Sequence, residues 1–66
     1  LIEPPTRREL EVLGWINEGL RNEEIAEQLL VGLATVKKHI NNLYAKLGVA
    51  SRTQALKRGR ELGLIE

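Results

Sequence analysis

The segment from Leu33 to Leu47 most constrains what this chain can fold into, because its residues divide into two faces at the period of a helix. At about 100° per residue, the aliphatic residues Val36, Ile40, Leu43 and Leu47 share one narrow sector. The opposite sector carries small and polar side chains, namely Ala34, Lys37, Lys38, Asn41 and Ala45. Such a pattern predicts a helix that packs one face and leaves the other in solvent.

Capping signals place helices on both sides of this segment. Thr6 followed by Glu9 forms a capping box, and Gly19 supplies a left-handed stop, which predicts a helix over about 7–18. Asn22 is expected to cap a second helix over about 23–29, because Asn accepts well from free backbone amides at a helix start. Gly32 then makes a turn so tight that the second and third helices should cross steeply.

The third helix is expected to span 33–47 and to end at Gly48, and Ser51 with Gln54 forms a weaker capping box for a fourth helix over about 52–62. Because no segment alternates apolar and polar residues for long, strands are not expected. The sequence therefore predicts an all-α domain of four helices. Gly59 lies inside the fourth helix, where glycine costs roughly 1 kcal/mol against alanine. Close approach of another backbone is the expected reason.

Length and composition narrow the class of protein. The 66 residues suffice for one domain, expected over 6–66, and the proline-containing stretch 1–5 is interpreted as a linker remnant. The chain has no methionine, so a missing upstream region is expected. The lack of cysteine agrees with a reducing compartment, and no apolar run approaches the ~20 residues of a membrane span, so we expect a cytoplasmic protein without membrane contact.

The charges are unevenly distributed along the chain. Residues 1–34 carry three arginines against seven glutamates, whereas residues 35–66 carry seven cations against two glutamates. Such asymmetry indicates a polyanionic partner, although a helical domain can also segregate charge by accident.

The residues available for catalysis are few. There is no Asp or Cys, and His39 and Ser51 are the only residues of their types. His39 is interpreted as a half-buried packing residue. The glutamates 23, 24 and 27 lie at a helix start, where the dipole already accounts for them. The glycines are not spaced as a phosphate loop. We therefore expect no enzyme, no metal and no cofactor.

The outer face of the third helix has two interpretations. Lys can donate to guanine and Asn can pair with adenine, so Lys37, Lys38 and Asn41 suit the reading of bases in a major groove. The alternative is an ordinary solvated face, and the small Ala26 with Val36 favours the close crossing of a helix-turn-helix. A separate hypothesis is a protein-interaction module using the fourth helix and Trp15, against the plainer view that Trp15 covers the edge of the core.

Four blocks of sequence resemble the successive parts of the LuxR-type (GerE-like) effector domain: TRRELEVL from Thr6, GLRNEEIAEQL from Gly19, TVKKH from Thr35 and KLGVASR from Lys46. Within that family the segment NLYAKLGV, from Asn42, is most similar to the MalT-like ATP-dependent regulators. The resemblance covers nearly the whole chain.

The resemblance implies the effector end of a bacterial transcription regulator, with the third helix in the major groove of promoter DNA and a sensor or ATP-binding region upstream. Base reading would fall to Lys37, Lys38 and Asn41, and phosphate contact to Thr35, Lys46, Asn22 and Arg52. A homodimer contact through the last helix would involve Ala55 and Gly59. Lys46 and Arg52 are independently expected to be exposed cations.

The chain departs from the family pattern near the start of the third helix. Gly32 stands where Ser is usual, so a side-chain cap is lost at a cost of a few tenths of a kcal/mol. Leu33 and Ala34 stand where polar residues are common, and Pro5 replaces an apolar residue before the Thr6 cap. An apolar contact to a thymine methyl is one alternative at Leu33 and Ala34. The preferred DNA sequence therefore cannot be taken from relatives.

Overall fold

The computed structural model describes residues 3–66, and Leu1 and Ile2 of the expected linker remnant lie outside the described residues. Four α-helices and no strand occur in the described part: α1 (Arg7–Asn17), α2 (Asn22–Leu29), α3 (Leu33–Leu47) and α4 (Arg52–Glu61). The predicted all-α, four-helix class is confirmed, and each helix boundary falls within one residue of its predicted position.

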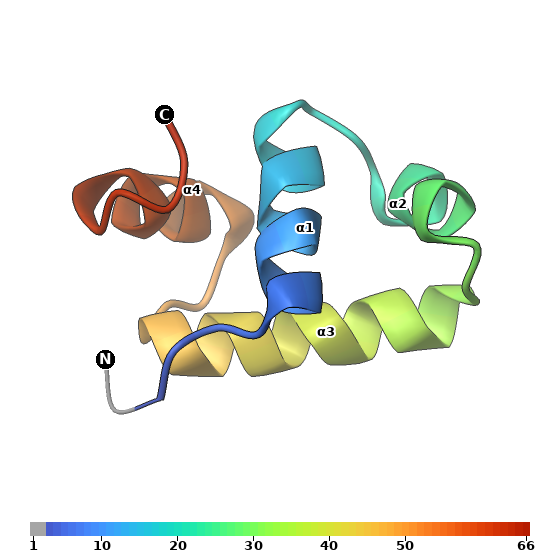
Figure 1. Ribbon diagram of the computed structural model, residues 1–66, viewed down its shortest axis with the longest axis horizontal. Helices are drawn as coiled ribbons and strands as arrows, with labels where there is room; N and C mark the ends of the chain where they lie inside the picture. Colours follow the sequence, from blue (N-terminus) through green and yellow to red (C-terminus); the bar gives the residue numbers. More distant parts are fainter. Residues whose placement is uncertain (1–2) are drawn as a thin grey trace.

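The helices are arranged around α1, which contacts all three others. Figure 1 shows α1 standing across α3, with α2 beside one end of α3 and α4 beside the other. The helices α2 and α4 do not contact one another, because α1 lies between them. The long helix α3 therefore lies along one side of the molecule, with one face turned toward the other three helices.

The core has two halves that meet along α1 and α3. One half is made by α1, α2 and α3, and its buried residues are Val12, Ile16, Ile25, Ala26, Val36 and Ile40. The other half is made by α1, α3 and α4, and its buried residues are Leu13, Leu43, Leu47 and Ala55. All four residues predicted for the inner face of α3 are buried, with at most 8% of any of them exposed. At roughly 1.5–3 kcal/mol per buried aliphatic side chain, this face is a principal stabilising surface.

Three leucines at the edge of the core remain partly or largely exposed. Leu10 is 37% exposed, because at about 100° per residue it lies on a different side of α1 from Val12 and Ile16. Leu29 is half-buried against the core. Leu30, which follows it in a left-handed conformation with φ of 57°, is 92% exposed.

Helix caps explain two of the helix starts. The capping box at α1 is confirmed: the Thr6 hydroxyl accepts from the Glu9 amide at 3.2 Å, and the Glu9 carboxylate accepts from the Thr6 amide at 2.9 Å. The predicted cap of α2 is wrong by one residue, since Arg21 and not Asn22 has the extended cap conformation. The reason is that Glu24, three residues later, accepts from the Arg21 amide at 2.8 Å.

At α4 the predicted capping box forms only in part. The Ser51 hydroxyl accepts from the Gln54 amide at 3.2 Å, as expected. The Gln54 side chain, however, accepts from the amide of Ala50, one residue before the cap, at 2.8 Å. Two hydrogen bonds therefore join Gln54, in the first turn of α4, to Ala50 and Ser51 in the loop between α3 and α4.

The structure explains Gly59 by contacts within the chain. A Cβ atom at this position would lie 3.1 Å from Leu13 Cδ2 and 3.1 Å from Ile65 Cγ1. The close neighbours are thus side chains of the second half of the core and of the C-terminal segment, not the backbone of another helix as the sequence suggested. No helix in the described part of the chain is both long and apolar enough to cross a membrane.

Replacing Gly48, the residue that ends α3, should lower the stability of the fold. Its φ of 70° is left-handed, and no atom lies within 4 Å of where a Cβ would be, so only backbone strain opposes a larger residue. We expect Gly48→Ala to lower the free energy of unfolding by about 1 kcal/mol and Gly48→Asn to lower it less, because Asn tolerates this conformation. Urea denaturation measures both, and equal stability of Gly48→Ala and the unchanged chain would contradict the expectation.

Candidate nucleic-acid interface

The outer face of α3 carries the three residues predicted to read bases. Lys37, Lys38 and Asn41 are exposed, and so are Thr35 and Ala34 near the same end of the helix. Within residues 3–66, the amines of Lys37 and Lys38 and the amide of Asn41 have no hydrogen-bond or ion-pair partner. These groups therefore point to solvent with their hydrogen-bonding capacity unused.

The start of α3 is open as well. Gly32 occupies the cap position with φ of −76° and ψ of 160°, and it makes no side-chain cap bond. Its carbonyl accepts from the amides of Thr35 and Val36 at 3.1 and 3.2 Å, which completes the first turn. The loss of the Ser cap foreseen from the sequence is thus present, and the helix still begins at the predicted residue.

Lys46 does not have the exposed position expected from the sequence. Its side chain is 15% exposed, and its Nζ atom lies 2.9 Å from the Oε1 atom of Glu9, whose side chain is 4% exposed. This ion pair joins the first turn of α1 to the last turn of α3. The expectation that Lys46 is a free cation is therefore wrong, because a buried carboxylate on α1 requires a cationic partner.

The pair with Lys46 also changes the acidity of Glu9. Burial by itself raises the pKa of the Glu9 carboxyl, but the hydrogen bond from Lys46, the bonds from Thr6 and the positive charge of Lys46 together outweigh it. The net result is a pKa below the ordinary value of 4.5. Glu9 is therefore ionised at neutral pH, where it both caps the start of α1 and pairs with Lys46 of α3.

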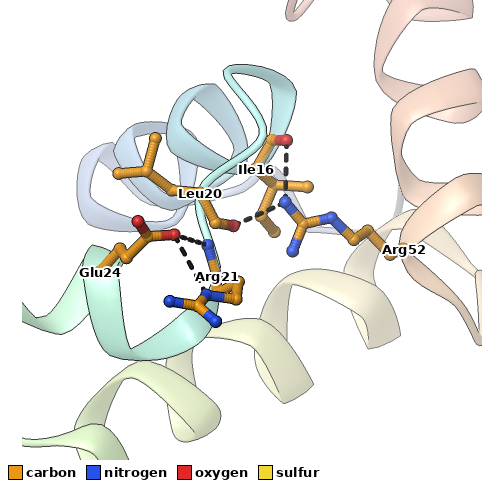
Figure 2. A network of polar contacts seen from close by, with 5 residues as sticks. All are labelled: Ile16, Leu20, Arg21, Glu24 and Arg52. Carbon is orange, nitrogen blue, oxygen red and sulfur yellow. Dashed lines mark hydrogen bonds and ion pairs between the residues drawn. The ribbon is translucent and has the colours of Figure 1, made fainter.

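Arg52 is the second cation that the structure uses internally. As Figure 2 shows, its Nη2 atom reaches back from the start of α4 to the end of α1 and donates to the carbonyls of Leu20 and Ile16, at 2.6 and 3.2 Å. Carbonyls at a helix C-terminus lack helical partners and attract positive charge. Arg52 therefore fixes α4 to α1, and it is not the freely exposed cation that the sequence predicted.

The remaining candidates have ordinary structural environments. Asn22 is half-buried in the first turn of α2. His39 is half-buried, as expected for a packing residue. Ala55 is fully buried and Gly59 is buried, so both face the core of their own chain. The described residues hold no group of three or more His, Cys, Asp or Glu residues placed to bind a metal.

Sequence reasoning missed the pair of Glu9 with Lys46, although a signal was present. Glu9 lies three and four residues before Val12 and Leu13, which puts it on the inner stripe of α1. A carboxylate on an inner stripe needs a cation, and Lys46 lies three residues after the buried Leu43. What the sequence cannot show is that the end of α3 passes the start of α1.

Acid should reveal the role of Glu9. Because its pKa is lower in the folded chain than in the unfolded one, the stability it contributes is complete above about pH 4.5 and is lost as the pH falls through the lowered pKa. We expect the unchanged chain to lose more free energy of unfolding between pH 7 and pH 3 than Glu9→Gln does, as measured by urea denaturation. Glu11→Gln, an exposed change on the same helix, is the control, and parallel profiles for the unchanged chain and Glu9→Gln would contradict the assignment.

Comparison with known proteins identifies a family and a similar solved structure. Residues 4–58 match the family model described as bacterial regulatory proteins, luxR family (GerE). Among solved structures, the chain is similar to the response regulator ChrA of a heme-sensing two-component system, with a TM-score of 0.91 and 40% sequence identity. The match covers 96% of this chain and 31% of that protein, so the chain spans about a third of its relative.

Proposed function

The chain belongs to the luxR family of bacterial regulatory proteins, and from this premise we propose that it binds double-stranded promoter DNA in a sequence-specific way, with α3 in the major groove. One observation carries the proposal. The inner face of α3 is buried along its length, while Lys37, Lys38 and Asn41 leave the outer face with free donors.

The dimensions of α3 suit this role. A helix with its side chains is about 10–12 Å across, which matches the ~12 Å width of the B-DNA major groove. The fifteen residues of α3 extend over about 22 Å, and its first turns lie at the edge of the domain beside α2, where a groove could receive them. We propose base contact for Lys37, Lys38 and Asn41, and phosphate contact for Thr35 at the same end.

We also propose phosphate contacts for Asn22, Lys46 and Arg52, although the last two are not the freely exposed cations that the sequence predicted. Lys46 and Arg52 are held by Glu9 and by the α1 carbonyls, so each would approach DNA with its position already fixed. A preformed orientation lowers the entropic cost of ordering a long side chain on binding. The same restraint means that removing either residue also affects folding.

Two variants test the proposal on the outer face. On a duplex selected from a random pool, Lys37→Ala should cost roughly 1–3 kcal/mol and relax the preference for bases at one position. Arg7→Ala, which removes an exposed cation from α1, is the matched control and should leave the preference unchanged. Fluorescence anisotropy over a series of salt concentrations measures both, and affinity for random duplex should fall steeply as salt rises. Equal effects of the two variants at every base pair would refute the assignment of α3.

The DNA affinity of Lys46→Ala can be interpreted only together with a measurement of its free energy of unfolding. It leaves the Glu9 carboxylate buried without its cation, which should lower the free energy of unfolding by roughly 3 kcal/mol. At a temperature where the variant remains folded, its affinity should fall by the same factor for all duplex sequences.

We also propose that two copies act together on paired half-sites through α4. Because Ala55 and Gly59 are packed inside their own chain, the contact would use the exposed residues of α4, among them Lys57 and Arg60. Sedimentation with a duplex carrying two half-sites should show two chains per duplex, and Ala55→Ser should act on stability only. A strict one-to-one complex would overturn the pairing.

The upstream region of the full protein is the last element of the proposal. The segment NLYAKLGV supports an ATP-dependent sensor of the MalT-like kind, whereas the similarity to ChrA supports the receiver arrangement of a response regulator. We propose a regulatory region of one of these two kinds, joined ahead of Thr6. Reading the upstream gene sequence distinguishes them, because only the first kind requires a phosphate-binding loop.

A further inference from the structure

A groove of about 600 Å³ runs between α1 and α2, outside the interface described above. Gly14 and Trp15 from α1 and Leu29 from α2 supply apolar lining, and the charged lining residues are Arg8, Glu11 and Glu18. Its lining residues belong to α1, to the cap residue Glu18 that follows it, and to α2, and none belongs to α3.

Nothing in the described part of the chain explains why residue 14 is a glycine. It lies in the interior of α1, where glycine weakens a helix relative to alanine. Its φ is not left-handed, and no atom lies within 4 Å of where a Cβ would be. Gly59, the other glycine inside a helix, is closely approached by Leu13 and Ile65. The open space above Gly14 therefore lies toward the groove, and no group of residues 3–66 fills it.

Trp15 lies next to this opening. It is half-buried, packs against the half of the core formed by α1, α2 and α3, and also lines the groove. A partly covered Trp gives a large rigid surface at little cost in conformational entropy, which is why Trp is enriched at the centres of protein interfaces.

The charges around the groove select the kind of partner. Glu11 is paired with Arg8 at 3.3 Å, but Glu18 has no ion pair among the described residues. A smaller hollow that shares Gln28 with the groove is lined by Glu24, which is paired with Arg21 at 3.5 Å, and by Glu27, which has no ion pair among the described residues. The surface on this side is therefore acidic, and its complement is a cationic partner.

We propose that this groove binds a basic segment of a partner protein, which places an apolar side chain over Gly14 and against Trp15 while its cations face Glu18 and Glu27. A second copy of this chain is a poorer occupant. Its basic helix α4 has its apolar residues turned into its own core, so it offers cations without an apolar anchor. Its most exposed apolar residue, Leu30, follows the acidic α2, which would meet like charge.

The groove stays accessible while DNA is bound. The helices α1 and α2 pack on the inner face of α3, whereas Lys37, Lys38 and Asn41 are on the outer face. A partner in the groove therefore would not compete for the DNA surface, and the two activities can be separated by mutation.

Trp15 is the only tryptophan of the chain and reports on the groove by its fluorescence. The probe is a synthetic helical peptide of about 16 residues built from Lys, Leu and Ala, and its control has Glu in place of every Lys. The Lys peptide should shift the Trp15 emission in a saturable way, and the Glu peptide should not. An equal response to both peptides, or none to either, would overturn the proposal.

Substitutions of Gly14 separate a binding role from a structural one. Gly14→Leu should raise the midpoint of thermal unfolding, because leucine is a better helix former than glycine. It should also lower the affinity for the Lys peptide roughly tenfold, because the leucine side chain fills the space above residue 14. Gly14→Ala should raise the midpoint with a smaller loss of affinity. Unchanged affinity in Gly14→Leu would overturn the proposal.

The acidic residues have a matched control. The double variant Glu18→Gln, Glu27→Gln should lower the affinity for the Lys peptide roughly threefold. The control is Glu3→Gln with Glu66→Gln, which changes two exposed glutamates outside the groove lining and should leave that affinity unchanged. Affinity for duplex DNA should stay the same in all these variants. Self-association of the chain that Gly14→Leu abolishes would assign the groove to a second copy and overturn the proposal of a basic partner protein.

Discussion

The burial of one face of α3 is the constraint on which the rest of the structure depends. Val36 and Ile40 close the half of the core shared with α2, and Leu43 and Leu47 close the half shared with α4. A single helix therefore completes both halves, and its rotation about its own axis is fixed by four side chains. Since a helix repeats every 3.6 residues, fixing the inner face also fixes which side chains point outward.

The same argument explains how much the sequence alone could provide. The periods of α1 and α3, the Thr6 capping box and the glycine stops are local patterns, and each located a helix end to within one residue. The outward position of Lys37, Lys38 and Asn41 follows from the same local period. These features require no knowledge of which helices meet.

What the sequence could not provide depends on contacts between residues far apart in the chain. Lys46 and Glu9 are separated by 37 positions, and Arg52 and Ile16 by 36. Both cations looked like surface residues because no local pattern shows which groups they meet, although the position of Glu9 on the inner stripe of α1 already indicated that it needs a cation. Gly59 was misread for a related reason, since its close neighbour Ile65 belongs to the segment after the last helix. Local patterns thus predicted the helices, whereas the roles of Lys46, Arg52 and Gly59 depend on tertiary contacts.

The double use of Glu9 has a structural consequence. One carboxylate oxygen of this residue accepts both from the backbone amide of Thr6, where the polypeptide enters the domain, and from the amine of Lys46 in the last turn of α3. The first residue before α1 and the last turn of α3 therefore depend on the same acceptor atom, so a change at Glu9 disturbs both places at once.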